Sequence, residues 1–150
     1  MEAVKQKSQT SDMLDKMYKN VKMGSDSIVN LMSKVSDEKL RQEMTNELDR
    51  FEKFAKDIEN IIYDNGGKPK EENPMTKFSA KMGMAMNTMI DSTPSHIAEM
   101  MIEGYAMGIS DMTKLIREYE NTSVPEKLLS LARGIVSFEE NSFEKMKSFL

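Results

Sequence analysis

Apolar residues recur along the first quarter of the chain at the spacing of one helix face. They follow one another in alternating steps of three and four residues, at Leu14, Met17, Val21, Gly24, Ile28, Leu31 and Val35. Such steps keep side chains on one side of an α-helix, where they can pack against another element. The pattern therefore predicts an amphipathic helix from about residue 11 to residue 35.

A second apolar face follows after a short polar interruption. Its members are Met44, Leu48, Phe51, Ala55, Ile58 and Ile62. Ser36-Asp37 precedes this face and is typical of a helix N-cap. Asp64-Asn65-Gly66-Gly67 follows it, and Asn and Gly tolerate the left-handed conformation that commonly ends helices. We therefore expect residues 11–65 to form an antiparallel helical hairpin with a very short connection.

The middle of the chain predicts a long connection and then a second hairpin. Residues 66–73 have loop composition, and Asn73-Pro74 suggests the N-terminus of a short helix that extends to about residue 91. Ser92-Thr93-Pro94 repeats this signal and predicts a helix to about residue 120. Ser123-Val124-Pro125-Glu126 has the pattern of a capping box and predicts a last helix that continues nearly to Leu150.

The two hairpins resemble each other in sequence. Residues 17–32 align with residues 101–116 at a constant offset of 84, which places Gly24 on Gly108. In the second helices an offset of 87 places Phe51-Glu52 on Phe138-Glu139. An internal duplication explains this register, and chance similarity between two amphipathic hairpins is the alternative. Two hairpins joined by residues 66–91 predict a single all-α domain over residues 1–150, a four-helix bundle with a crossover.

A family resemblance adds to this expectation. The segments DSTPSHIAEMMIEGYAMGISDMTKLIREYE (91–120) and FEENSFEKMKSFL (138–150), supported by MYKNVKMGSDSI in the first hairpin, resemble the ferritin-like superfamily. The similarity is to small clostridial-type bundles, some of which are related to spore coat proteins. The resemblance implies a ferritin-like four-helix bundle whose crossover carries an extra short helix. It also implies a di-iron site with one Glu from the first helix of each hairpin and a Glu-x-x-His from the second.

The sequence departs from this ligand pattern. The chain has one His, and Ala55 and Ser142 stand where the resemblance would place the two His ligands. The first helices carry Gly24 and Gly108 in the middle of their apolar faces instead of Glu. We therefore expect no catalytic residues, no cofactor and no di-iron centre.

A residual carboxylate site for iron is the first alternative. It would use Glu52, Asp111 and Glu139. Glu139 falls near the apolar face of its helix, and a buried carboxylate should have a partner because its desolvation costs free energy. Otherwise these acids would lie on solvated faces or pair with Lys.

Methionine raises a second alternative, which is a soft-metal site. The chain contains 16 Met, and thioethers suit Cu(I). The candidate ligands are Met82 and Met86, with His96 and Met100 one turn apart on one helix. However, the spacing Met75, Phe78, Met82, Met86 and Met89 makes one continuous helical stripe, which favours apolar packing. Met84 lies off that stripe and suggests a contact with a partner, and we expect a homodimer.

Composition narrows the possible functions. A net charge of −4 and a pI of about 5.2 provide no overall basic field, so we expect no nucleic-acid partner. Cys is absent, which excludes disulfides and thiol chemistry. The sequence shows no signal peptide and no apolar run long enough for a membrane span, so a cytoplasmic location is expected. We predict a non-enzymatic structural or interaction protein with an unknown protein partner. The alternatives are metal binding and a small apolar ligand in a Met-lined cavity.

Overall fold

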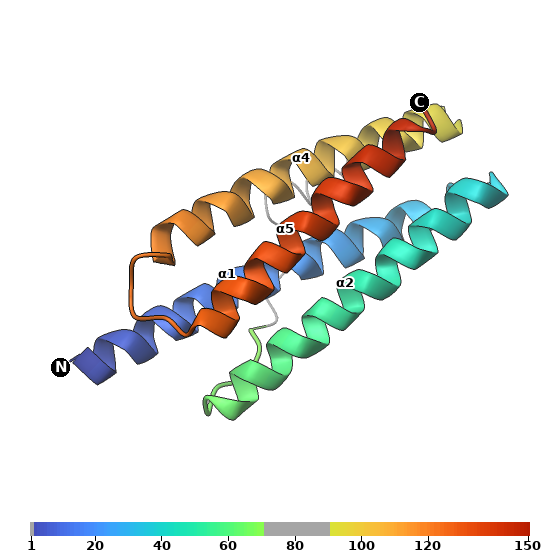
Figure 1. The fold of residues 1–150 in the computed structure, drawn as a ribbon. Helices are drawn as coiled ribbons and strands as arrows, with labels where there is room; N and C mark the ends of the chain where they lie inside the picture. The colour runs from blue at the N-terminus through green and yellow to red at the C-terminus, as the bar shows by residue number, and fades with distance from the viewer. Residues whose placement is uncertain (1, 71–90) are drawn as a thin grey trace.

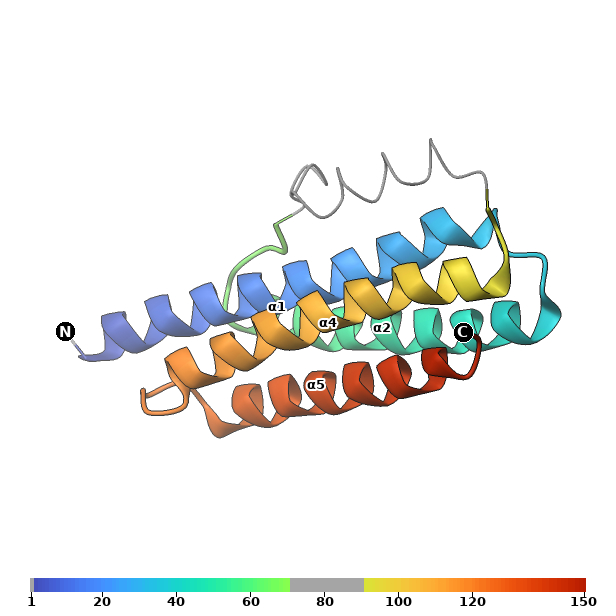
Figure 2. The same cartoon turned by 90° about the horizontal axis from the view of Figure 1, so that it is seen from above.

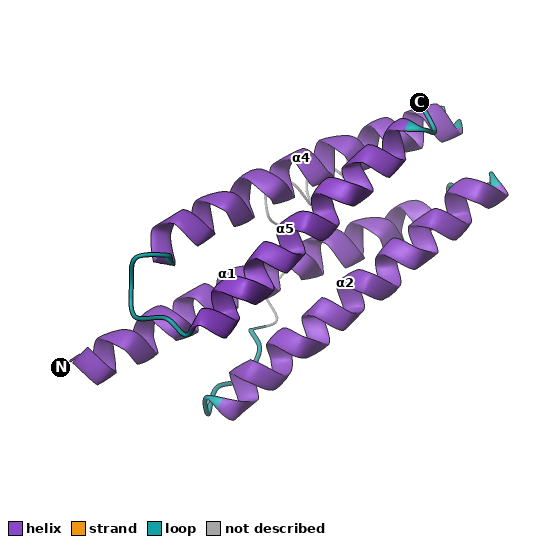
Figure 3. Cartoon of the chain, in the orientation of Figure 1, coloured by secondary structure: helices purple, strands orange, loops and turns teal. Residues whose placement is uncertain are grey.

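The computed structural model describes residues 2–70 and 91–150, which form four α-helices (Figure 1). These helices are α1 (Glu2–Met32), α2 (Glu38–Asp64), α4 (Pro94–Tyr119) and α5 (Glu126–Lys147). Turns and loops make up the rest of the described residues, which contain no strand (Figure 3). The prediction of an all-α four-helix bundle is confirmed.

The first helix starts earlier than the apolar pattern predicts. α1 begins at Glu2 rather than near residue 11, and it ends at Met32 rather than at Val35. Residues 2–8 are exposed, so they carry no apolar periodicity that could reveal the helix. At this end of the bundle, the Gln6 side chain donates a 2.8 Å hydrogen bond to the Ser123 carbonyl in the loop between α4 and α5 (Figure 1).

Three of the predicted helix boundaries have the expected chemistry. The Asp37 carboxylate accepts a 2.9 Å hydrogen bond from the Leu40 amide at the start of α2. Gly66 has a φ of 80° just beyond the end of α2, a conformation that glycine adopts at little cost. Thr93 caps α4, with Pro94 in its first turn.

The capping box predicted at Ser123 is wrong. The residue that precedes α5 is Pro125, and no side chain caps this helix. Ser123 lies two residues before that position, so its hydroxyl is not placed to accept the first amides of the helix. Proline can occupy the boundary because it has no N–H that would need a partner.

The helices pack as two antiparallel hairpins, α1 with α2 and α4 with α5, and α1 also packs along α4 (Figures 1 and 2). α2 ends at the opposite end of the bundle from the start of α4, so the chain between them has to join the two ends. This is the predicted crossover arrangement. The helix predicted at 74–91, with its methionine stripe and Met84, lies outside the described residues.

The apolar faces meet along the axis of the bundle. The predicted positions of the first two apolar faces, and the positions 84 residues after those of the first face, are buried except for Gly24, Leu48 and Gly108, which are partly buried. At the centre, the Phe51 ring stacks with Tyr105 at 6.0 Å between centroids and meets Phe138 edge-on at 4.9 Å. Aromatic pairs in these geometries stabilise a core beyond their burial alone. Among the described helices, none has an apolar stretch long enough to cross a membrane.

Candidate functional site

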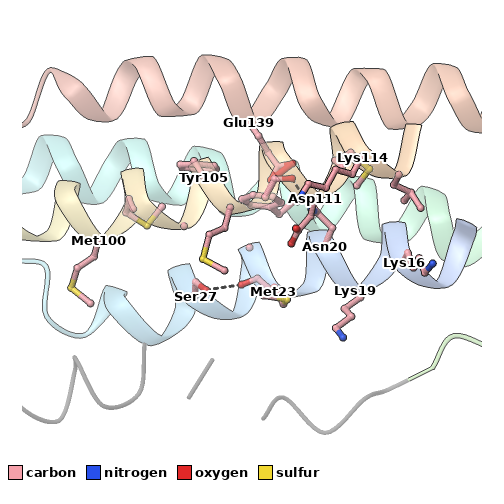
Figure 4. A pocket seen from close by; sticks show the side chains of 18 of the residues that line it. Lys16, Lys19, Asn20, Met23, Ser27, Met100, Tyr105, Asp111, Lys114 and Glu139 are labelled. Carbon is pink, nitrogen blue, oxygen red and sulfur yellow. Dashed lines mark hydrogen bonds between the residues drawn. The ribbon is translucent and has the colours of Figure 1, made fainter. Parts of the chain in front are cut away.

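A cavity of about 340 Å³ lies between α1 and α4, with Glu139 of α5 in its wall (Figure 4). Its volume falls in the range typical of small-molecule sites. Three glycines also line this space: Gly24 on α1, and Gly104 and Gly108 on α4. Five methionines contribute to the lining, namely Met23, Met100, Met101, Met107 and Met112.

The two ends of the cavity differ in polarity. Figure 4 places Met100 at one end and Lys16 and Lys19 toward the other, with Asp111 and Lys114 on the α4 side. Near the polar end, the Lys16 ammonium lies 3.1 Å from the Asp12 carboxylate and 3.8 Å from the Glu118 carboxylate. The cavity is therefore amphipathic along its length.

Glu139 is the buried polar group of this cavity. It is 3% exposed, and its Oε1 lies so close to Gly108 that a Cβ there would overlap the carboxyl group. Its Oε2 is buried and has no hydrogen-bond partner among the described residues. Burial, and then the nearby negative charge of Asp111, raises the pKa of Glu139 to about 8. The carboxyl group is therefore mostly protonated at neutral pH, and the partner expected from the sequence is not present in the described part of the chain.

A second buried acid lies on α2. Glu47 is 2% exposed, and its Oε1 accepts a 2.5 Å hydrogen bond from the Tyr105 hydroxyl. Burial, and then the neighbouring Glu43 carboxyl group, raises the pKa of Glu47 to about 9. Burial and Glu47 also raise the pKa of Tyr105 well above its ordinary value. Tyr105 thus lies between two acids, because the Glu139 charge acts on it as well.

Sequence reasoning missed Glu47, although a signal was present. Glu47 follows Met44 by three residues and precedes Phe51 by four, which is the spacing of the apolar face itself. An acid at such a position is either buried or breaks the face. The hydrogen bond from Tyr105 and protonation of the carboxyl group make burial tolerable here.

The burial of individual residues corrects the alignment of the two hairpins in their second helices. Between the first helices the offset of 84 holds, since Met17, Ile28 and Leu31 are buried like Met101, Met112 and Leu115. Between the second helices an offset of 88, not 87, pairs buried positions with buried positions: Leu40 with Leu128, Met44 with Ala132, Glu47 with Ile135, Phe51 with Glu139, and Ile58 with Met146. One residue rotates a helix position by about 100°. Glu52, which the offset of 87 aligned with Glu139, is accordingly exposed.

The corrected register reveals two equivalent places in the bundle. Gly24 lies against the Phe51 ring in the first hairpin, and Gly108 lies against the Glu139 carboxyl group in the second. In both hairpins glycine leaves room for a large buried side chain from the facing helix. The side chain is aromatic in one case and acidic in the other.

The structure separates the candidate metal ligands. Asp111 and Glu139 line the same cavity, whereas Glu52 is exposed on α2 and does not line it. Within residues 2–70 and 91–150, no group of three or more His, Asp or Glu side chains is arranged to hold a metal ion. His96 is partly exposed, with Nδ1 3.7 Å from the Glu99 carboxylate, while Met100 is buried in the cavity wall. Met82 and Met86 lie outside the described residues.

The fold and the site define an all-α four-helix bundle with an amphipathic cavity that opens to the surface and two buried, protonated acids. The chain belongs to the family described as Domain of unknown function (DUF2383), whose model matches residues 9–118. This match includes α2, most of α1 and nearly all of α4. No curated protein and no solved structure matches the chain at the significance that we required.

Proposed function

We propose that this protein is a non-enzymatic, ferritin-like bundle that has lost its di-iron centre and acts through its surfaces as a structural or interaction protein. The observation that carries the proposal is the equivalence of Phe51 and Glu139. A di-iron bundle needs carboxylate and imidazole ligands from both hairpins. In this chain, the buried position that holds an acid in the second hairpin holds a phenyl ring in the first.

The comparison extends to the other positions that a di-iron site would use. Glu139 and Ser142 stand at the Glu-x-x-His positions of α5, and the equivalent residues of α2 are Phe51 and Phe54. Gly24 and Gly108 stand at the centre of the first helices. Of these six positions, Glu139 alone has a side chain that commonly binds iron.

The packing of the centre also supports the proposal. The Phe51 ring contacts the rings of Tyr105 and Phe138, and Phe54 packs on Phe138 with centroids 5.6 Å apart. These rings fill the region toward which the metal ligands of a ferritin-like bundle converge. An apolar centre of this kind stabilises the fold without a metal ion.

Iron loading tests the loss of the centre. The purified protein is loaded aerobically with Fe(II) and desalted, and its metal content is measured beside that of Glu139→Gln. We expect neither protein to retain stoichiometric iron. Two iron ions per chain in the wild type, lost in the variant, would restore the metal-binding function as the better explanation.

The methionines need a separate loading experiment. Anaerobic loading with Cu(I) is compared between the wild type and a Met82→Leu/Met86→Leu variant, which keeps the apolar volume but removes both thioethers. We expect no stoichiometric copper in either protein. Copper bound by the wild type and lost in the double variant would favour soft-metal handling instead.

The interaction role includes self-association and a cytoplasmic location as parts of the proposal. We expect a homodimer in sedimentation equilibrium at micromolar concentration. A strictly monomeric protein that retains no partner from its own host would contradict an interaction role.

A further inference from the structure

The lining of the cavity between α1 and α4 favours one class of ligand, and the proposed interaction role does not involve that ligand. Its lining includes Met100, Met101 and Met107, and the Tyr105 and Phe51 side chains also contribute to its wall. Its acidic groups, Glu139 and Asp111, come from α5 and α4. A ligand that fits both regions needs an apolar body and one polar group.

The charges around Glu139 determine whether the polar group of the ligand should be positive or negative. Asp111 is the charged neighbour that acts on Glu139, and it is negative. Tyr105 on α4 faces the same carboxyl group from the core side, while Lys16 and Lys19 line the α1 wall. Lys16 is already paired with Asp12 and Glu118, which reduces its effect on the cavity. Glu139 therefore has an acidic neighbour and a buried oxygen with no hydrogen-bond partner among the described residues, and within residues 2–70 and 91–150 no cation lowers its pKa.

We propose that this cavity binds a small hydrophobic ammonium compound, with the ammonium group between Glu139 and Asp111 and the apolar body among the methionines. An ammonium group supplies hydrogen-bond donors to the Glu139 carboxyl group, and its single positive charge lies between that group and the Asp111 carboxylate. The Phe51 and Tyr105 rings favour a cation further, because aromatic faces attract positive charge. Methionine side chains adapt to apolar bodies of irregular shape.

Binding of such a cation releases a proton. The free Glu139 carboxyl group holds a proton at neutral pH, since its pKa is about 8, and the bound ammonium group stabilises the ionised form. Affinity should therefore rise with pH between 6 and 8, approaching tenfold per unit well below the pKa. A neutral ligand that accepts a hydrogen bond from the protonated carboxyl group would show the opposite dependence.

Three compounds of equal chain length separate the possibilities. Binding of n-octylammonium, 1-octanol and octanoate is measured by calorimetry at concentrations where none of them aggregates. We expect n-octylammonium to bind most tightly, and its affinity to fall at least about tenfold in Glu139→Gln, which loses a charge-assisted hydrogen bond. Asp111→Asn should weaken binding less. The affinity for 1-octanol should not fall in Glu139→Gln.

Glu52→Gln is the matched control, because it makes the same substitution at an exposed site outside the cavity. It should leave the affinity for n-octylammonium unchanged. Methyl resonances of the protein labelled at methionine locate the ligand: Met100, Met101 and Met112 line the cavity, whereas Met13, Met44 and Met146 are buried elsewhere. Shifts should be confined to the five methionines that line the cavity.

Several results would overturn the proposal. Octanoate or 1-octanol could bind as tightly as n-octylammonium or more tightly, or n-octylammonium could fail to bind at millimolar concentration. Glu52→Gln and Glu139→Gln could change its affinity equally. The ligand could also shift methyl resonances of methionines outside the cavity. Circular dichroism of each variant establishes that it is folded before binding is measured. The outcome is independent of the iron experiment, because the ammonium site requires no metal and no partner protein.

Discussion

The Tyr105 hydroxyl on α4 donates a hydrogen bond of 2.5 Å to the Glu47 carboxyl group on α2, and this bond joins the two hairpins inside the bundle. The Tyr105 ring also stacks with Phe51, so one side chain connects the buried acid to the aromatic centre. Within the described residues, the Glu47 Oε2 takes part in no hydrogen bond. The Glu43 carboxyl group is nevertheless close enough to raise the pKa of Glu47. The stability of the pair therefore depends on the tyrosine.

Removing the tyrosine hydroxyl should destabilise the protein. Tyr105→Phe keeps the ring but leaves Glu47 without its donor, which we expect to cost about 1–3 kcal/mol of unfolding free energy. Tyr63→Phe is the control, because Tyr63 is 58% exposed and its substitution should change stability by less than about 0.5 kcal/mol. Urea denaturation at pH 7 measures both. Equal stability of the two variants would show that the hydrogen bond does not contribute.

The protein should lose stability as the pH rises from 5 to 9. The pKa values of Glu47 and Glu139 are raised from the ordinary 4.5 to about 9 and about 8, so the native state keeps two protons that the unfolded chain releases. A carboxyl group whose pKa is raised in the folded state contributes its full stabilisation below about pH 4.5. This contribution is lost as the pH rises through the pKa of the folded state. The groups that face Glu47 are Glu43, Tyr105 and Lys145; the Tyr105 hydrogen bond and then the Lys145 charge oppose the rise in its pKa. We expect a decrease of several kcal/mol between pH 5 and pH 9, measured by urea denaturation.

Replacing both acids by Gln should flatten this pH dependence. Gln has the same shape as the protonated acid but does not titrate, so Glu47→Gln/Glu139→Gln should be more stable than the wild type at pH 9. At pH 5 the two proteins should differ much less. A double variant with the same slope as the wild type would mean that other groups cause the loss.

Glycine at position 24 should be required, whereas glycine at position 134 should not. A Cβ at Gly24 would overlap the Phe51 ring, which is held by its aromatic neighbours, so Gly24→Ala should incur an overpacking cost of about 1–3 kcal/mol. A Cβ at Gly134 meets nothing within 4 Å, so Gly134→Ala should stabilise α5 by about 0.5–1 kcal/mol through helix propensity. Thermal unfolding of both variants tests the pair, and stabilisation by both would contradict the close contact at Gly24.

The two predicted caps should differ in their contribution to stability. Asp37→Ala removes the acceptor for the Leu40 amide and should cost about 1 kcal/mol. Ser123→Ala should cost much less, because Ser123 uses its backbone carbonyl, which the substitution retains, in the contact with Gln6. Chemical denaturation of the two variants distinguishes them. An equal loss in both would restore the capping box at Ser123.

The sequence by itself determined the helices and the faces they bury. Steps of three and four residues depend on local geometry alone, so Leu14, Ile58 and Leu115 could be assigned to the core without knowledge of their partners. Asp37, Gly66 and Thr93 act on amides or dihedral angles of their own turn, so these boundaries were also predictable. The capping-box prediction was wrong because α5 begins directly after Pro125. The residue types alone do not determine at which of these positions the helix starts.

Only the tertiary structure decided which chemical groups meet. The register of α5 against α4 places Glu139, rather than its neighbour Phe138, against Gly108, so one residue of register decides whether this position holds an acid or a ring. The pairing of Tyr105 with Glu47 joins residues 58 positions apart, and the cavity between α1 and α4 is lined by residues from all four helices. These relationships depend on how two helices rotate about their axes when their ridges pack, and that rotation is set by the whole interface rather than by local spacing.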